Sequence, residues 1–119
     1  MRLQHVSIPV PPGAGEEVRR FYGDLLELEE RDVLPTLDPK SFIWYRAGGD
    51  LELHIMLVDE PPPERPHFCL AVDDGLDALR ARLEAAGVRT RDGSMLVGRP
   101  RFFCWDPFGN LVEFTQLSR

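Results

Sequence analysis

Two stretches of alternating apolar and polar residues, HVSIPV at 5–10 and HFCLAV at 67–72, each begin with a histidine. Residues two apart share one face of a β-strand, so this alternation predicts two half-buried strands. The apolar positions would face the core, whereas His5 and His67 would lie on the opposite face. The same alternation puts Ser7 and Cys69 beside them.

Helical periodicity follows each of these predicted strands. Apolar residues recur three and four positions apart, the spacing that places side chains on one face of an α-helix. Gly87 follows the second series, at the position where a helix C-terminus favours a left-handed residue. The two series are Val18, Phe21, Tyr22 and Leu25, and then Leu76, Leu79, Leu83 and Ala86.

Further strand patterns complete each half of the chain. A hairpin is predicted at 105–110, where Pro107 sets the turn and Gly109 accepts a positive φ. One weak strand is predicted in each half, at 29–34 and at 88–91. The stronger strands are SFIWYR at 41–46, LELHIMLV at 51–58, RFFCW at 101–105 and NLVEFTQL at 110–117.

The proline-rich run EPPPERP at 60–66 separates two halves that have the same order of elements. Internal repetition of this kind is a primary indicator of architecture. The pattern therefore predicts an α+β protein of two βαβββ modules. We place module 1 at 1–59, the linker at 60–66 and module 2 at 67–119.

Composition limits the class of protein. A chain of 119 residues, 43% of them hydrophobic, suits one compact domain. The 14 basic and 20 acidic residues give a net charge of −6, which argues against a nucleic-acid partner. No apolar run is long enough to span a membrane, so we expect a cytoplasmic protein. Cys69 and Cys104 lie in strand patterns and are interpreted as reduced packing residues.

Histidine and glutamate recur at matching distances in the two halves. His5 and Glu52 are 47 residues apart (5 to 52), and His67 and Glu113 are 46 apart (67 to 113). Alternation places all four away from the helices. If the two sheets curl toward each other, the four side chains can converge on one point.

Two imidazoles and two carboxylates suit a divalent metal ion, and Zn, Ni, Co, Mn and Fe all remain possible. His54 lies two residues beyond Glu52 on the same face. It could therefore replace Glu52 as a ligand, support a ligand through a hydrogen bond, or act as an acid or base.

Structural roles compete with this interpretation. A single histidine at a strand start is more often a hydrogen-bonded structural residue, and glutamate is most often a solvated surface residue. Aromatic residues on strands are more often core than pocket; they are Phe42, Trp44, Phe103 and Trp105.

The segments HVSIPV, FYGDLLELE, LELHIML, HFCLAVDDGLDALRARLEAAGV and FFCWDPFGNLVEF together resemble the vicinal oxygen chelate superfamily. This superfamily includes glyoxalase I, bleomycin resistance proteins, fosfomycin resistance thioltransferases, methylmalonyl-CoA epimerase and extradiol dioxygenases. The resemblance implies two βαβββ modules forming a cleft of curled mixed sheets, usually within a homodimer. It also implies metal ligands at His5, His67 and Glu113, with Glu52 at a fourth ligand position and His54 beside it.

The activity implied by the resemblance is that of a glyoxalase I-like lyase or isomerase with a small-molecule substrate. The metal would polarise vicinal oxygens and stabilise an enediolate, while Glu113 or Glu52 carries a proton between adjacent carbons. Two alternatives stay open. One is a metal-free protein that binds a drug-like molecule, and the other is a dioxygenase or thioltransferase with only His5, His67 and Glu113 at the metal.

Overall fold

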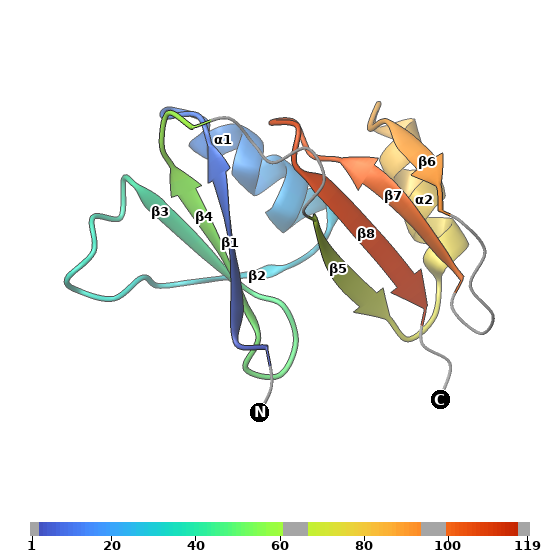
Figure 1. Ribbon diagram of the computed structural model, residues 1–119, viewed down its shortest axis with the longest axis horizontal. Coiled ribbons are helices and arrows are strands. Elements are labelled where there is room, and N and C mark those ends of the chain that lie inside the picture. The colour runs from blue at the N-terminus through green and yellow to red at the C-terminus, as the bar shows by residue number, and fades with distance from the viewer. Residues whose placement is uncertain (1–2, 61–66, 94–99, 117–119) are drawn as a thin grey trace. The chain divides into compact units, whose positions relative to one another are not determined.

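The chain forms two units that repeat one order of elements: a strand, a helical segment and three strands (Figure 1). A computed structural model describes residues 3–60, 67–93 and 100–116. The units divide between Pro62 and Pro63, within the predicted linker. Residues 61–66 of that linker lie outside the described residues.

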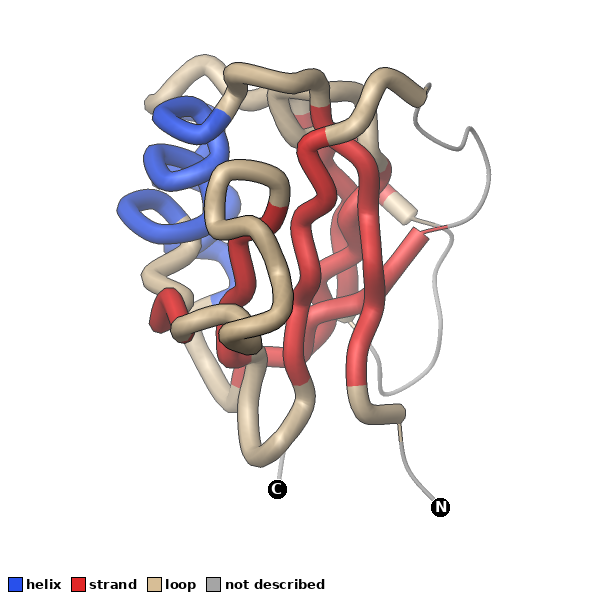
Figure 2. The backbone as a smooth tube through the Cα atoms, turned by 90° about the vertical axis from the view of Figure 1, so that its left-hand side faces the viewer, coloured by secondary structure: helices blue, strands red, loops and turns tan. Residues whose placement is uncertain are grey.

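The first unit contains a four-stranded mixed sheet in the order β1-β4-β3-β2. β1 and β4 are parallel, and the other neighbours are antiparallel. In Figure 2 the helical turns of this unit lie along one side of its strands. Its elements are β1 His5–Val10, α1 Gly15–Val18, the π-helical segment η1 Arg19–Leu25, β2 Glu29–Arg31, β3 Phe42–Arg46 and β4 Glu52–Leu57.

The second unit repeats this arrangement in the order β5-β8-β7-β6, with β5 and β8 parallel. Its other neighbouring strands are antiparallel. The predicted βαβββ order is thus confirmed in both units. The elements are β5 His67–Val72, α2 Leu76–Ala85, β6 Thr90–Asp92, β7 Arg101–Trp105 and β8 Leu111–Gln116.

Alternation along the strands predicts most of the core. Most apolar residues predicted to face the helical segments are buried, whereas Val6, Leu57, Leu70 and Val72 are half-buried. Burial of this kind is the main stabilising contribution in a small domain. The buried residues include Ile8, Val10, Ile43, Leu53 and Ile55 in the first sheet, and Phe68, Phe102, Cys104, Val112 and Phe114 in the second.

The two helical segments differ in form. α2 is regular, buries Leu79 and Leu83, and ends before Gly87, which has φ of 84° as predicted. The first helical segment is instead α-helical for four residues and π-helical from Arg19 to Leu25. The backbone N–H of Leu26 donates to the carbonyl of Phe21 at 3.0 Å, an i to i−5 bond. This wider turn leaves Leu25 only half-buried, although α-helical spacing predicts it in the core.

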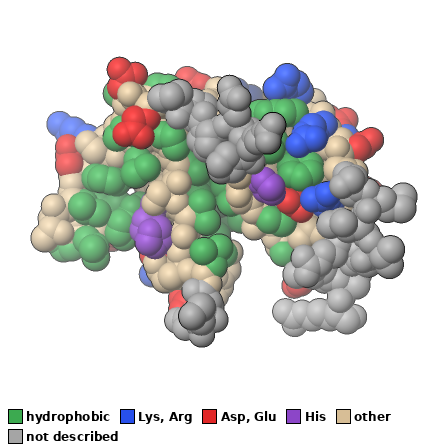
Figure 3. Space-filling model, viewed as in Figure 1, with side chains coloured by type: hydrophobic (Ala, Val, Ile, Leu, Met, Phe, Trp, Pro, Cys, Tyr) green, Lys and Arg blue, Asp and Glu red, His purple; other side chains and the backbone are tan. Residues whose placement is uncertain are grey.

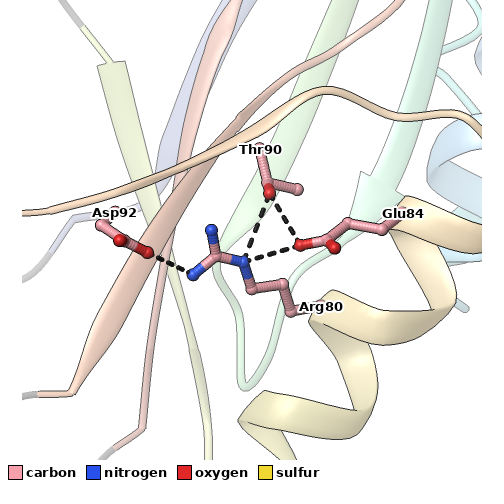
Figure 4. Close-up of polar contacts among 4 residues, drawn as sticks. All are labelled: Arg80, Glu84, Thr90 and Asp92. Atoms are coloured by element: carbon pink, nitrogen blue, oxygen red, sulfur yellow. Dashed lines mark hydrogen bonds and ion pairs between the residues drawn. The ribbon is translucent and has the colours of Figure 1, made fainter.

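Arg80 connects α2 to β6 through a group of polar contacts (Figure 4). Its Nη1 donates to Asp92 at 2.6 Å, and its Nε donates to both Glu84 and Thr90, at 2.9 and 3.2 Å. Thr90 Oγ1 also donates to Glu84 at 2.9 Å. The carboxylates of Glu84 and Asp92 are therefore both committed to Arg80, on the helix side of the sheet.

None of the helices in the described ranges is both long and apolar enough to cross a membrane.

The two cysteines have different environments, and neither is in a disulfide. Cys104 is fully buried in β7, in agreement with a packing role, and burial raises the pKa of its thiol to about 12. Cys69 is exposed on β5, so its interpretation as a packing residue is wrong. It lies on the face of the sheet that α2 does not cover.

We expect a thiol reagent such as DTNB to label one cysteine per chain in the native protein at pH 8 and both in urea. Thiolate is the reactive form, and a thiol with a pKa of about 12 that is also buried offers almost none. Cys69→Ser should reduce native labelling to zero, while Cys104→Ser leaves it at one. Labelling of Cys104 at the rate of Cys69 would contradict the burial of β7.

Candidate functional site

His5 and Glu52 lie opposite one another on the parallel strands β1 and β4. Their side chains are linked through Gln4. Gln4 Nε2 donates to Glu52 Oε1 at 2.9 Å, and His5 Nδ1 lies 2.7 Å from Gln4 Oε1. His54 Nε2 lies 3.3 Å from the same Glu52 oxygen. We use "open face" for the face of each sheet that the helical segment of its own unit does not cover. The open face of the first sheet therefore carries a connected group formed by Gln4, His5, Glu52 and His54.

The carboxylate of Glu52 fixes the direction of these hydrogen bonds. An ionised carboxylate only accepts, so Gln4 Nε2 and His54 Nε2 must both donate to it. The amide oxygen of Gln4 then faces His5, and His5 Nδ1 must be the donor. This leaves the lone pair of His5 on Nε2 and that of His54 on Nδ1. Histidines that bind metals commonly donate their other ring N–H to a carboxylate or carbonyl oxygen in this way.

Ionisation agrees with these assignments. The hydrogen bond from Gln4 lowers the pKa of Glu52, and the contact with His54 acts in the same direction against the effect of burial. Burial lowers the pKa of His54, opposed by its hydrogen bond to Glu52. His54 is therefore a neutral imidazole at pH 7, the form that binds a metal ion.

Aromatic contacts fix the ring of His54. It is stacked on Trp44, with ring centroids 3.9 Å apart, and on His5, with centroids 4.3 Å apart. The three rings come from β3, β4 and β1, neighbouring strands of one sheet. The stack restricts the rotamers of both histidines and so reduces the entropy lost when they bind a ligand.

The second sheet carries a smaller group of the same kind on its open face. His67 Nε2 lies 2.9 Å from Glu113 Oε1, and Arg101 Nη1 donates to Glu113 Oε2 at 3.3 Å. The ring of Phe103 packs edge-on against His67, with centroids 5.4 Å apart. Figure 3 shows histidine side chains reaching the surface in both units.

The strand registers show which positions of the two units correspond. In the first unit His5 pairs with Glu52 and Ser7 with His54. In the second unit His67 pairs with Leu111 and Cys69 with Glu113. The counterpart of Glu113 is thus His54, and the counterpart of Glu52 is Leu111. Glu52 and Glu113, which we matched by their distance along the chain, do not occupy equivalent positions.

Strand neighbours and burial support the conclusion that His54 and Glu113 occupy equivalent positions in their own units. On the neighbouring strands, Trp44 lies opposite His54 and Phe103 lies opposite Glu113. The side chains of His54 and Glu113 are both 13% exposed, whereas that of Glu52 is 29% exposed.

Each group brings an imidazole nitrogen within hydrogen-bond distance of a carboxylate oxygen: His67 Nε2 lies 2.9 Å from Glu113 Oε1, and His54 Nε2 lies 3.3 Å from Glu52 Oε1. Imidazole nitrogen and carboxylate oxygen are donor types that divalent transition metals bind. His54 would offer a metal its Nδ1, the nitrogen that keeps the lone pair when Nε2 donates to Glu52. Among the described residues, however, no three His, Cys, Asp or Glu side chains form a group that could hold a metal. Within the described ranges, neither group by itself is a complete metal site.

Sequence reasoning identified the histidines and glutamates of both groups but missed Gln4 and Arg101. Gln4 precedes the first predicted strand, and its amide links two residues 47 positions apart (5 to 52). Arg101 begins β7 on the same face as Phe103, two residues before it, so alternation could have placed it near Glu113. The charge complementarity of these two residues was the available signal.

The chain belongs to the Glyoxalase/Bleomycin resistance protein/Dioxygenase superfamily, whose family pattern matches residues 2–114. The predicted resemblance is confirmed at this level. No curated protein matches the sequence.

Solved structures of similar fold include enzymes and binding proteins. A Bacillus anthracis protein assigned to the glyoxalase family is 29% identical, with 99% of this chain and 96% of that chain covered and a TM-score of 0.89. The antibiotic binding protein TnmS3 from Streptomyces sp. CB03234 is 25% identical, with coverage of 99% and 97% and a TM-score of 0.72. The fosfomycin resistance protein FosX from Listeria monocytogenes, solved with Mn(II), is 17% identical, with coverage of 98% and 92% and a TM-score of 0.79.

Proposed function

We propose that this protein is a metal-dependent lyase or isomerase of the glyoxalase I type, acting on a small substrate with vicinal oxygens. The observation that carries the proposal is the pair of imidazole and carboxylate groups on the open faces of the two sheets. Membership of the superfamily and the Mn(II) complex of FosX support a divalent metal, with Zn, Ni, Co, Mn and Fe all suited to the donors.

His5, His67 and Glu113 are the first three proposed metal ligands. For the fourth we propose His54 in place of Glu52, because the strand registers make His54 the counterpart of Glu113. In this arrangement Glu52 orients His54 directly and His5 through Gln4. When bound, the metal would polarise the two oxygens of the substrate.

Glu52 is then the better of the two candidate bases. Both hydrogen bonds to its carboxylate end on Oε1, so Oε2 is available to accept a proton from the substrate. Glu113 is held at both oxygens, by His67 and by Arg101. We propose that Glu52 removes a proton from one carbon, giving an enediolate, and returns it to the adjacent carbon.

The first test is metal binding. Protein freed of metal with EDTA should gain roughly 10 °C in Tm when Zn, Ni or Mn is present at about a hundred times its Kd. Glu113→Gln should remove most of this gain, because an amide replaces an anionic ligand. Glu16→Gln is the matched control, since Glu16 is exposed on α1 and the chemical change is the same.

A gain in Tm that is equal in both variants would contradict the assignment of Glu113, and no gain with any of the three metals would contradict the metal-dependent function. Activity is tested by incorporation of solvent deuterium at the reacting carbon of a panel of 2-hydroxy carbonyl compounds. Glu52→Gln should abolish exchange and still bind metal.

A metal-free binding protein is the second candidate, favoured by the stacked rings of Trp44, His54 and His5. A planar ligand could extend such a stack, and TnmS3 is an antibiotic binding protein. In this case planar aromatic compounds would raise the Tm and metals would not.

A homodimer and a cytoplasmic location stay predictions.

A further inference from the structure

Three arginines gather over two aromatic rings on the open face of the second sheet. The guanidinium of Arg89 lies 3.9 Å from the ring centroid of Trp105, and that of Arg91 lies 4.5 Å from the centroid of Phe103. Arg101 lies 5.2 Å from the same Phe103 centroid. These five residues form the arginine-aromatic patch, which belongs entirely to the second unit.

Strand geometry explains why the patch forms. Arg91 pairs with Phe103 across β6 and β7, and the backbone N–H of Trp105 donates to the carbonyl of Arg89 at 3.2 Å. Thr90, between the two arginines, turns instead toward Arg80 and α2. Because successive side chains of a strand point to opposite faces, Arg89 and Arg91 both lie on the face that α2 does not cover.

The positive charge of the patch is only partly balanced. Arg101 pairs with Glu113, but no carboxylate of the described ranges forms an ion pair with Arg89 or Arg91. The nearest carboxylates along the chain, Glu84 and Asp92, are bound to Arg80 on the other side of the sheet (Figure 4). In a protein with a net charge of −6, such a local excess of cations needs a specific explanation.

We propose that the arginine-aromatic patch binds the anionic group of the protein's small-molecule ligand: a carboxylate, phosphate or phosphonate on an apolar or aromatic body. A guanidinium that lies over a ring still presents N–H groups at its edge, and these suit the oxygens of such an anion. Arg89 and Arg91 would bind the anion, while the rings of Phe103 and Trp105 hold the two side chains in place.

The patch is continuous with the His67 and Glu113 group. Arg101 contacts both Phe103 and Glu113, and the ring of Phe103 packs against His67. An anion at Arg91 would therefore place the remainder of the ligand beside His67. This part of the inference rests on the proposed function, because it gives the substrate a negative charge at one end.

The test is a calorimetric titration of the full chain with benzoate, phenylphosphonate and benzyl alcohol, in low salt, on protein from which both metal and chelator have been removed. The two anions represent planar and tetrahedral groups, and the alcohol is the uncharged counterpart. At least one anion should bind, and the alcohol should not bind at about 10 mM. Arg89→Gln and Arg91→Gln should each weaken anion binding about tenfold or more, because each removes charge-assisted hydrogen bonds.

Arg20→Gln is the matched control, since Arg20 is exposed on η1 and the loss of charge is the same. It should change anion binding less than about twofold. The inference is overturned if neither anion binds, if the alcohol binds equally well, or if all three variants weaken binding to the same extent.

Titration of the metal-free protein separates this result from the proposed function. Anion binding without metal that depends on Arg89 and Arg91 supports the patch even if no metal raises the Tm, in which case only the metal-dependent function fails. Metal binding without anion binding overturns only the patch.

Discussion

His54→Phe is expected to weaken divalent-metal binding about 100-fold or more, whereas Glu52→Gln weakens it about tenfold or less. Phenylalanine keeps a ring to stack between Trp44 and His5 but has no nitrogen to donate to a metal. Glutamine keeps the oxygen that accepts from Gln4 and His54. Removing a residue that only orients metal ligands typically lowers metal affinity 10- to 100-fold. Loss of a ligand should lower the affinity more than this, and Glu52→Gln, which keeps the accepting oxygen, should lower it less. Competition with a chromophoric chelator measures both affinities.

The distance along the chain and the strand register make opposite predictions for these two variants. If Glu52 is the ligand, as the matched distances suggest, Glu52→Gln should be the more damaging change. His54→Phe must also keep the unfolding free energy within about 1 kcal/mol of that of the wild type, so that a loss of affinity is not a loss of folding. Equal losses in the two variants would show that neither residue alone is the fourth ligand.

The fold was predictable because its determinants are local. Alternation identifies the longer strands and their buried faces, and the helical spacing from Leu76 to Ala86 identifies α2, which ends at Ala85. The first helical segment was less predictable, since spacing alone does not distinguish an α-helix from the π-helical turns that begin at Arg19. Backbone hydrogen bonding decides between them, and the apolar pattern does not encode it.

The candidate site was predictable in its residue types but not in its pairing. The distance from His5 to Glu52 includes loops, and loops change length without changing the sheet. In the register, the partner of His5 is 47 residues away (5 to 52), but the partner of His67 is only 44 away (67 to 111). The near-equality of 47 and 46 therefore matched Glu113 with a residue two positions too early in β4.

Side-chain contacts between distant segments account for the rest. Arg89 approaches Trp105, and Arg91 approaches Phe103, because β6 pairs with β7. The alternation pattern identifies each strand separately but does not say which residues of the two strands lie opposite one another. From the sequence, Phe103 and Trp105 were interpreted as core. Phe103 is indeed buried, at 5% exposure, but on the face opposite α2, where Arg91 and Arg101 lie over its ring.

The hairpin between β7 and β8 was predicted from Pro107 and Gly109, yet its stability depends on Asp106. This side chain is only 5% exposed. Its Oδ1 accepts the backbone N–H groups of Phe108 and Asn110, at 2.9 and 2.8 Å, and its Oδ2 accepts the side-chain amide of Asn110 at 2.9 Å. Asn110 is itself 2% exposed, so little water can replace these bonds if the carboxylate is lost.

Asp106→Ala should therefore lower the free energy of unfolding by about 2 to 4 kcal/mol, a large part of the roughly 5 to 15 kcal/mol that stabilises a small protein. Asp106→Asn keeps one acceptor oxygen and should cost less. Asp38→Ala is the matched control, because Asp38 accepts a similar turn bond from the backbone of Lys40 at 2.9 Å but is exposed. Water can replace that bond, so we expect a loss below about 1 kcal/mol. Urea unfolding followed by circular dichroism measures all three variants, and equal losses for Asp106→Ala and Asp38→Ala would contradict the role of burial at Asp106.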